Sequence, residues 1–438
     1  MIVVNVKDFH DASALKNARA LMRSCKDNQA LQDLITTVVE KNKCWRGQEC
    51  INLLAAESPT SPTVRSLLSA EVGTRAASGH IGAHSRWVKG TRYIDQLEAL
   101  SLEYLKQLFK CDYAEHRLLG GTIACHVVYA ALTQPGDTIM SFSPAVGGDS
   151  SNRKNGPPGV LRLNIIDIPF DNYNFNIDMG KFLPLARKHK PKLVSLGLGM
   201  TLFSLPLKSI RDVISEWGGI LYYDAAHQLG LIAGGVHQDP FAVGTDVVSG
   251  STGKTFSGPQ GGLLLWNHPK FTKKLINTVF PVFVGTHQIN RVAALAVATA
   301  ESIAFGNVYM QQVVRNAKAL ARALDAHGIP VMCAHKDYTE THQIIIDVSQ
   351  WGSGDQVACC LESCNIIVNT VQLPASKQSN GIRIGVVEIT RLGMREAEMI
   401  ILANLITQIL IEKKSVKIIA LKVIELRKSF QKIHYCFD

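Results

Sequence analysis

The 438-residue sequence predicts an α/β fold, with a mostly parallel sheet in a large domain followed by a smaller C-terminal α/β domain. From about residue 51 to 306, short apolar runs alternate with longer amphipathic segments, which is typical of a parallel sheet with helices on both faces. Beyond residue 308 the pattern changes to one long helical segment, two strand-like runs and terminal helices. We therefore expect a helical arm over residues 1–45, a large domain over 46–306 and a small domain over 307–438.

The elements follow from the spacing of apolar residues. In the arm, Leu31, Leu34, Ile35 and Val38 lie on one face of an expected helix, a stripe suited to packing on a partner subunit. Strands of the large domain are expected at residues 193–198, 220–223, 247–249 and 262–266, and a helix at 123–132. Strands of the small domain are expected at residues 343–348 and 381–385.

Composition narrows the classes of function. The formal net charge is +10, but the lysines and arginines are dispersed, which argues against a nucleic-acid groove and fits either anionic small ligands or plain solvated surface. No apolar run approaches the roughly 20 uncharged residues of a membrane span. The N-terminus shows no basic region followed by an apolar one, so we expect a cytoplasmic protein without a membrane partner. Ten cysteines without CxxC spacing predict reduced, mostly buried thiols rather than disulfides or zinc.

Lys254 is the most informative residue of the sequence. Residues 246–255 (DVVSGSTGKT) place this lysine after an apolar, β-branched run, in a loop of small residues that continues to Gly262. A lysine in that position suits covalent chemistry better than solvation. In pyridoxal phosphate enzymes, a lysine holds the cofactor aldehyde as a Schiff base and a carboxylate pairs with the pyridine nitrogen.

A candidate for that carboxylate ends another strand-like run. Residues 219–227 (GILYYDAAH) place Asp224 where a strand should end, and ligands of open α/β sheets gather at the carboxyl ends of the strands. His227 could bond the phenolic oxygen of the cofactor or stack near its ring. Each has a plainer alternative, a helix N-cap for Asp224 and a buried, satisfied imidazole for His227.

Two further segments suit the anionic ends of the cofactor and of an amino acid. Gly121 and Thr122 stand at the expected start of the helix at 123–132, where free N–H groups and the helix dipole favour a phosphate. Arg383 lies within an apolar strand-like run, and its guanidinium can grip a carboxylate with two hydrogen bonds. A structural turn and a solvent-facing arginine are the respective alternatives.

Four segments resemble the serine hydroxymethyltransferase family. The similarity runs in order from about residue 51 to the C-terminus, and the combination of motifs is specific. The segments are residues 53–62 (LLAAESPTSP), 224–234 (DAAHQLGLIAG), 251–262 (STGKTFSGPQGG) and 381–391, which opens with GIRIG and closes with ITR.

This resemblance implies the aspartate-aminotransferase type of pyridoxal phosphate fold, fold type I, and a homodimer with active sites at the subunit interface. It implies that Lys254 forms the Schiff base, that Asp224 pairs with the pyridine nitrogen, and that Arg383 binds the substrate carboxylate. The resemblance also implies that Gly121 and Thr122 form the phosphate-binding turn and that Gly285 and Thr286 lie in a loop that reaches the phosphate of the neighbouring subunit. We further expect Asp224, His227, Ser251 and Lys254 to bind the cofactor, with Lys254, Asp224 and His227 as the catalytic residues.

The chain departs from the family pattern at groups that handle the one-carbon unit. Ala56 stands at the position of a substrate-contacting serine, Ala76 at that of a phosphate-binding tyrosine, and Ser78 at that of a proton-shuttling glutamate. The ring-stacking histidine falls at Val146, and the histidine before the lysine at Gly253. Since a serine hydroxyl is far too weak an acid to replace a carboxylic acid, we do not expect the standard tetrahydrofolate mechanism.

An insertion brings possible replacements into the same segment: His80, His84, Arg86 and Lys89, with His287 as a further candidate acid or base. Glycines at 79 and 82 disfavour a helix there, so the His80/His84 spacing is not expected to bind a metal.

We therefore expect a pyridoxal phosphate enzyme that makes or breaks the Cα–Cβ bond of an amino acid by aldol or retro-aldol transfer, of the hydroxymethyltransferase or transaldolase type. Its partners would be an amino-acid substrate and an aldehyde or one-carbon acceptor. Threonine transaldolases resemble the same family. The alternatives are a decarboxylase, β-lyase or aminotransferase with the same cofactor, or a catalytically silent protein that binds the cofactor.

Overall fold

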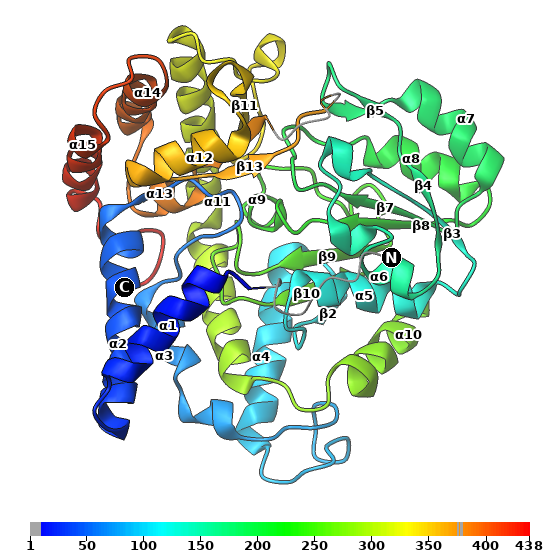
Figure 1. The fold of residues 1–438 in the computed structure, drawn as a ribbon. Coiled ribbons are helices and arrows are strands. Elements are labelled where there is room, and N and C mark those ends of the chain that lie inside the picture. The colour runs from blue at the N-terminus through cyan, green and yellow to red at the C-terminus, as the bar shows by residue number, and fades with distance from the viewer. Residues whose placement is uncertain (1–9, 375, 377–379) are drawn as a thin grey trace.

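A seven-stranded, mostly parallel sheet forms the centre of the protein (Figure 1). The computed structural model describes residues 10–374, 376 and 380–438. Every neighbouring pair in the sheet is parallel except the two pairs made by β10, which runs antiparallel to β2 and β9. In spatial order the strands are β2 (Tyr113–Glu115), β10 (Gly262–Trp266), β9 (Val247–Ser251), β8 (Ile220–Asp224), β7 (Leu193–Gly197), β3 (Thr138–Ser141) and β4 (Asn164–Asp167).

Side chains along each strand point alternately to the two faces of the sheet, and each face has its own hydrophobic core. On one face, Leu221 and Tyr223 of β8 pack with helices α4 (Arg92–Phe109), α7 (Met179–His189) and α8 (Leu207–Ser215). On the other face, Ile220 and Tyr222 pack with α5 (Gly121–Leu132) and α10 (Thr272–Asn277). Both faces of the central strands are buried, which confirms the α/β architecture expected from the sequence.

A third core lies beside the large sheet and contains a three-stranded antiparallel sheet. Its strands, in spatial order, are β11 (Gln343–Asp347), β14 (Gly381–Gly385) and β13 (Asn369–Val371). The surrounding helices are α11 (Ile289–Ala326), α12 (Gly354–Ser363), α13 (Val387–Arg391), α14 (Glu396–Leu410) and α15 (Val416–Lys428). The parallel pair of β1 (Ile51–Asn52) and β12 (Ile366–Ile367) joins an early segment to this part of the chain.

Short elements connect these parts: α3 (Pro62–Leu68), α6 (Pro157–Val160), α9 (Leu229–Ala233), and the hairpin of β5 (Phe170–Asp171) with β6 (Asn176–Ile177). We propose that a large and a small domain divide near residue 306. That position lies within the continuous helix α11, and the β1–β12 pair places residues 51–52 at the third core, that of the three-stranded sheet.

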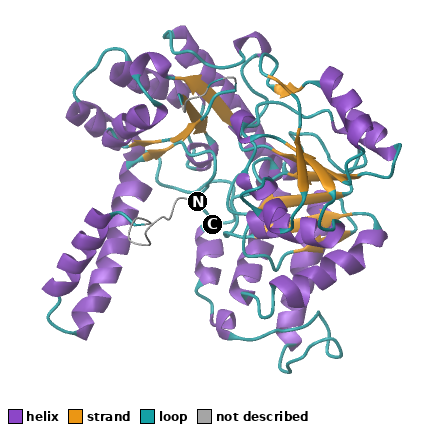
Figure 2. Cartoon of the chain, turned by 45° about the vertical axis from the view of Figure 1, so that its right-hand side comes forward, coloured by secondary structure: helices purple, strands orange, loops and turns teal. Residues whose placement is uncertain are grey.

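Two helices form an N-terminal hairpin that projects from the rest of the chain (Figure 2). They are α1 (Ala12–Ser24) and α2 (Asn28–Cys44), and neither has a buried residue. Apolar side chains on this hairpin, including Met22, Ile35 and Val39, are exposed. In the predicted stripe, Leu31, Ile35 and Val38 are exposed and Leu34 is half-buried. The packing of this stripe on a partner subunit stays a prediction.

Two further sequence-based expectations concern the thiols and membrane spans. All ten cysteines are free, but only five of them are buried. The expectation of mostly buried thiols is therefore wrong. Three thiols lie at exposed positions of helices: Cys44, Cys359 and Cys360. In the described residues one helix, α11, is long and apolar enough to cross a membrane. However, 56% of its most apolar stretch is buried inside the protein, as in a core helix.

Candidate active site

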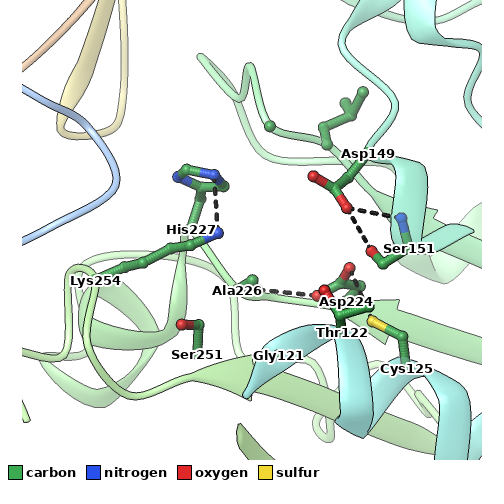
Figure 3. Close-up of a pocket in the computed structure, with 12 residues that line it drawn as sticks. Gly121, Thr122, Cys125, Asp149, Ser151, Asp224, Ala226, His227, Ser251 and Lys254 are labelled. Atoms are coloured by element: carbon green, nitrogen blue, oxygen red, sulfur yellow. Dashed lines mark hydrogen bonds between the residues drawn. The ribbon is translucent and has the colours of Figure 1, made fainter. Parts of the chain in front are cut away.

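A cavity with about 530 Å³ of empty space opens at the carboxyl ends of the parallel strands (Figure 3). Its lining comes from the start of α5, the segment after β3, and the ends of β7, β8 and β9. The lining residues are Gly121, Thr122, Cys125, Asp149, Ser151, Leu198, Gly199, Asp224, Ala226, His227, Ser251 and Lys254.

Lys254 projects into this cavity from the turn that follows β9 (Figure 3). The turn is held by backbone bonds from Thr252 N to Gly261 O, 3.0 Å, and from Gly258 N to Thr252 O, 2.8 Å. Burial lowers the pKa of the Lys254 amine, which raises the fraction of the neutral, nucleophilic form. The residue thus has the environment needed to attack an aldehyde.

Asp224 ends β8 and receives four hydrogen bonds. Its Oδ1 accepts from the backbone N–H of Ala226 and from Ser249 Oγ, both at 3.2 Å. Its Oδ2 accepts from Asn152 Nδ2 at 2.9 Å and from the Cys125 thiol at 3.4 Å. Burial raises the pKa of Cys125 well above its usual value, so the thiol stays a neutral donor. All four donors are neutral, so none of them brings a positive charge next to the carboxylate.

Asn152 is fixed by a second set of bonds. Its Oδ1 accepts from Tyr129 Oη at 2.6 Å and from Ser195 Oγ at 3.0 Å, which leaves Nδ2 directed at Asp224. A Cβ on Gly197 would lie 2.7 Å from Asn152 Nδ2 and 2.9 Å from the Asp224 Cβ. Glycine at 197 therefore allows the amide and the carboxylate to meet beside β7.

His227 links Lys254 to the three-stranded sheet. Its Nδ1 lies 3.2 Å from Nε2 of Gln343, at the start of β11, and its own Nε2 lies 3.2 Å from Lys254 Nζ. Burial lowers the pKa of His227 well below its usual value, so the ring is neutral. With the Gln343 amide donating to Nδ1, the ring proton is assigned to Nε2, the nitrogen that faces Lys254 Nζ.

Arg383, in β14, approaches the cavity through Gly199. Its Nη1 donates to the Gly199 carbonyl and its Nε donates to Asn369 Oδ1 at 3.2 Å. Within the described residues Nη2 makes no hydrogen bond. Burial lowers the pKa of Arg383 to about 10, which still leaves the guanidinium charged at neutral pH. One edge of a cation is thus free to meet an anionic ligand.

The start of α5 offers a phosphate-sized set of donors. No side chain caps this end of the helix, so the first-turn N–H groups stay available. Thr122 and Ser251 bring hydroxyl groups to the same wall of the cavity. A Cβ on Gly121 would lie only 3.5 Å from the Ser251 Cβ, so the two segments run close together. Three groups of the cavity match the three ends of pyridoxal phosphate: the Lys254 amine suits its aldehyde, the Asp224 carboxylate its ring nitrogen, and the start of α5 its phosphate.

Several predicted residues lie outside this cavity. Thr286 Oγ1 is 2.9 Å from Ser78 Oγ, and neither of them, nor Gly285, lines it. The roles of Gly285 and Thr286 require a second subunit and stay predictions.

The candidate replacements for the missing acid also lie elsewhere. Arg86 pairs with Asp95 at 2.8 Å and with Glu98, and His287 Nε2 lies 2.5 Å from Glu98 Oε1. Burial lowers the pKa of His287 to about 4. Arg86, Asp95 and Glu98 are therefore ion-paired beside a neutral His287 ring, and within one chain none of these side chains lines the cavity. The cavity is not lined by His80, His84 or Lys89 either.

The sequence interpretation missed Asp149, Asn152, Cys125 and Gln343. A signal for the first two was present, because Asp149 follows two glycines shortly after the buried run that forms β3. Polar residues after a parallel strand fall at the ligand-binding edge. For Cys125 and Gln343 the sequence shows only ordinary helix and strand positions.

Known proteins resemble the whole of this chain. The sequence profile of the serine hydroxymethyltransferase family matches residues 29–406. The serine hydroxymethyltransferase of Aeropyrum pernix is 40% identical over 409 residues, which cover 92% of this chain and 93% of that protein. The enzyme of the same name from Methanopyrus kandleri is 40% identical over 414 residues, with 93% and 96% covered.

A solved structure shows the same fold. The L-threonine transaldolase of Pseudomonas fluorescens superposes with a TM-score of 0.86 at 25% identity, over 97% of this chain and 96% of that one. Together with the cavity described above, these similarities confirm fold type I and the cofactor expected from the sequence. The chain belongs to the serine hydroxymethyltransferase family and is a pyridoxal phosphate-dependent enzyme of the transferase and aldolase type.

Proposed function

We propose that pyridoxal phosphate is held by three groups of this chain. The Lys254 amine takes the aldehyde, the Asp224 carboxylate takes the pyridine nitrogen, and the start of α5 takes the phosphate together with Thr122 and Ser251. The environments of these groups support the assignment, because the amine is biased to its neutral form and the carboxylate is surrounded only by neutral donors. Bound pyridoxal phosphate supplies an electron sink for the pair released when a bond to the α-carbon of an amino acid breaks.

The remaining polar side chains position the amino acid. Arg383 binds its carboxylate through the free Nη2 edge, while Gly199 and Asn369 hold the guanidinium in place. His227 presents the Nε2 proton toward the cofactor side of the cavity and stays neutral throughout the physiological pH range. The amino group then lies near Lys254 and the carboxylate near Arg383, which fixes the direction in which the side chain of the substrate leaves the α-carbon.

We propose that the reaction is an aldol or retro-aldol transfer at the Cα–Cβ bond, without the standard folate mechanism. The observation that supports this proposal is that the residues expected to bind the cofactor are present, whereas the acid needed for the folate reaction is replaced. The groups that serve the electron sink are present in one cavity, whereas Ser78 stands where the family has a proton-shuttling glutamate and is bonded to Thr286. A hydroxymethyl transfer to tetrahydrofolate depends on such an acid, and a serine hydroxyl cannot provide the proton.

A transfer between two aldehydes needs no folate. A β-hydroxy amino acid would lose its side chain as an aldehyde, and a second aldehyde would add to the same carbon. The similarity to an L-threonine transaldolase supports this class of substrate for the present chain.

A homodimer would complete the site. We propose that the loop with Gly285 and Thr286 reaches the cavity of the partner subunit and that the α1–α2 hairpin packs on the partner. The exposed apolar side chains of the hairpin support this arrangement. Sedimentation of the purified protein at the mass of two chains is the expected result.

The test of the reaction is incubation of the cofactor-loaded enzyme with L-threonine, L-serine and other amino acids. The expected products are aldehydes, with exchange products when a second aldehyde is added. Release of carbon dioxide or ammonia in their place would overturn the aldol assignment. The folate question is tested by the transfer of a hydroxymethyl group from L-serine to tetrahydrofolate, with Ser78→Glu as the variant for comparison. The unmodified enzyme should not carry out this transfer. Efficient transfer by the unmodified enzyme would overturn that part of the proposal.

A further inference from the structure

Asp149 is a carboxylate in the cavity to which the cofactor assignment gives no role. Of the described side chains that line this cavity, two are carboxylates, and Asp224 is the other. Asp149 follows β3 and stands across the cavity from Lys254 and His227 (Figure 3). Asp224 lies deeper, within its ring of four donors, so Asp149 is the acid that faces the open part of the site.

One oxygen of Asp149 is fixed and the other is free. Its Oδ1 accepts from the backbone N–H of Ser151 at 2.8 Å and from Ser151 Oγ at 2.6 Å. Within the described residues Oδ2 accepts no hydrogen bond. The backbone before it is pinned as well, because the N–H of Gly199 donates to the Gly147 carbonyl at 2.8 Å. A carboxylate held in this way presents one basic oxygen in a defined place.

Asp149 also lies close enough to act on both cations that bind the substrate. Burial lowers the pKa of Arg383 to about 10, and the charge of Asp149 opposes that effect. Burial likewise lowers the pKa of Lys254, and the charges of Asp224 and Asp149 oppose it. A small amino acid bound with its amino group at Lys254 and its carboxylate at Arg383 would lie between two cations that both feel the charge of Asp149.

We propose that Asp149 is a catalytic residue that accepts the β-hydroxyl proton of the substrate when the Cα–Cβ bond breaks, and that returns a proton to the oxygen of the aldehyde that adds. The inference rests on the proposed aldol function. In the forward step the O–H bond breaks, the proton moves to Asp149 Oδ2, and the O–H pair forms the second C–O bond of the leaving aldehyde. The Cα–Cβ pair stays on the α-carbon, where the cofactor provides the sink. Addition of a second aldehyde runs the same changes in reverse, so no oxidant, reductant or net proton is required.

This role accounts for the loss of the family's glutamate at Ser78. A retro-aldol step requires a base for one hydroxyl proton, and a carboxylate on the wall of the cavity can serve a substrate that carries that hydroxyl. A purely structural role is the competing explanation, because Asp149 also caps the short 3₁₀ turn Ser150–Asn152 through Ser151 N.

The test compares two reactions of the cofactor-loaded enzyme that differ only in their need for a hydroxyl proton. Asp149→Asn keeps the size of the side chain and an oxygen for Ser151, but removes the base. We expect acetaldehyde release from L-threonine to fall by about 100-fold or more, the usual range for loss of a general base. Exchange of the α-hydrogen of glycine in D2O, and the dissociation constants of glycine and of pyridoxal phosphate, should stay within about threefold, because none of these uses the missing proton acceptor.

Asp178→Asn is the matched control, since Asp178 caps α7 through Lys181 N far from the cavity. It should leave both reactions unchanged. If Asp149→Asn cleaves L-threonine at the unmodified rate, or loses glycine exchange and cofactor affinity by the same factor as cleavage, the inference is overturned and Asp149 is structural. If the unmodified enzyme releases no aldehyde from any β-hydroxy amino acid, the proposed function fails first.

Discussion

Replacement of Asn152 by alanine should weaken cofactor binding, and this loss of affinity can be measured separately from the loss of protein stability. The amide donates to Asp224 Oδ2 at 2.9 Å, and a buried hydrogen bond to a charged group contributes about 1.5–3 kcal/mol. If that bond holds Asp224 in the orientation that meets the pyridine nitrogen, its loss corresponds to a rise of about 10- to 150-fold in the dissociation constant of pyridoxal phosphate.

The same substitution has a cost in stability. Tyr129 Oη and Ser195 Oγ both donate to Asn152 Oδ1, and both would lose their acceptor inside the protein. Each unsatisfied hydroxyl costs about 1–3 kcal/mol, so the free energy of unfolding of the cofactor-free protein should fall by about 2–6 kcal/mol. Titration of the cofactor-free protein with pyridoxal phosphate and urea unfolding of the same sample measure the two effects separately.

Asn316→Ala provides the matched control. This buried asparagine in α11 also bonds three neighbours, with Nδ2 donating to Thr390 Oγ1 at 2.8 Å and to Met394 O at 2.9 Å, and Oδ1 accepting from Gln312 Nε2 at 2.9 Å. It lies outside the cavity, so its replacement should lower stability to a similar extent and leave cofactor affinity unchanged. The reasoning is refuted if Asn152→Ala binds pyridoxal phosphate as tightly as the unmodified protein does, or if both variants lose affinity equally.

Three other substitutions test separate groups. Lys254→Ala should abolish the covalent attachment of pyridoxal phosphate that borohydride fixes, as read by mass spectrometry, and a variant that keeps the label would exclude Lys254 as the attachment point. Arg383→Lys should raise the dissociation constant of glycine by about 10-fold or more with little change for the cofactor, because an ammonium cannot reproduce the bidentate grip; unchanged glycine affinity would remove Arg383 from substrate binding. Burial raises the pKa of Glu388 to about 7 from 4.5. Since the folded state then holds a proton that the unfolded state releases, stability should fall by up to about 3 kcal/mol as pH rises from about 4.5 to 7. Glu388→Gln should reduce the change of the urea unfolding midpoint with pH over that interval. An equally steep dependence on pH in the variant would contradict the assignment.

The fold was predictable where the chain repeats a simple pattern. The apolar runs at 193–198, 220–223 and 262–266 became β7, β8 and β10, because strands covered on both faces need continuous apolar sequence. The predicted strand at 247–249 continues through Gly250 and Ser251, since these residues pair with Leu263 and Gly262 of β10. Small residues carry no apolar signal, so backbone pairing alone sets that end.

The positions of single residues within the fold were predictable from the sequence, but the contacts between them were not. Asp224 lies at the end of β8, and Lys254 lies in the turn after β9, as the sequence indicated. The contact between Asp224 and Asn152 joins residues that are 72 positions apart, and it depends on the absence of a side chain at Gly197. Neither feature has a local pattern. Roles assigned to Gly285 and Thr286 depend on a second chain, so a single sequence could name the positions but not the contact.

The carbonyl of Gly199 connects the two halves of the site. It accepts from Arg383 Nη1 and, at 3.2 Å, from Gln343 Nε2, both of which come from the three-stranded sheet. Gln343 also bonds His227, which in turn contacts Lys254 on the large sheet. The expected carboxylate grip and the lysine amine are therefore tied to one backbone oxygen. A Cβ at Gly199 would lie 3.4 Å from Arg383 Nη1, so a side chain there would press on the guanidinium before it reached any substrate. The positions of the guanidinium and, through Gln343 and His227, of the amine therefore both depend on contacts to the Gly199 carbonyl, so a shift of this carbonyl should move both groups.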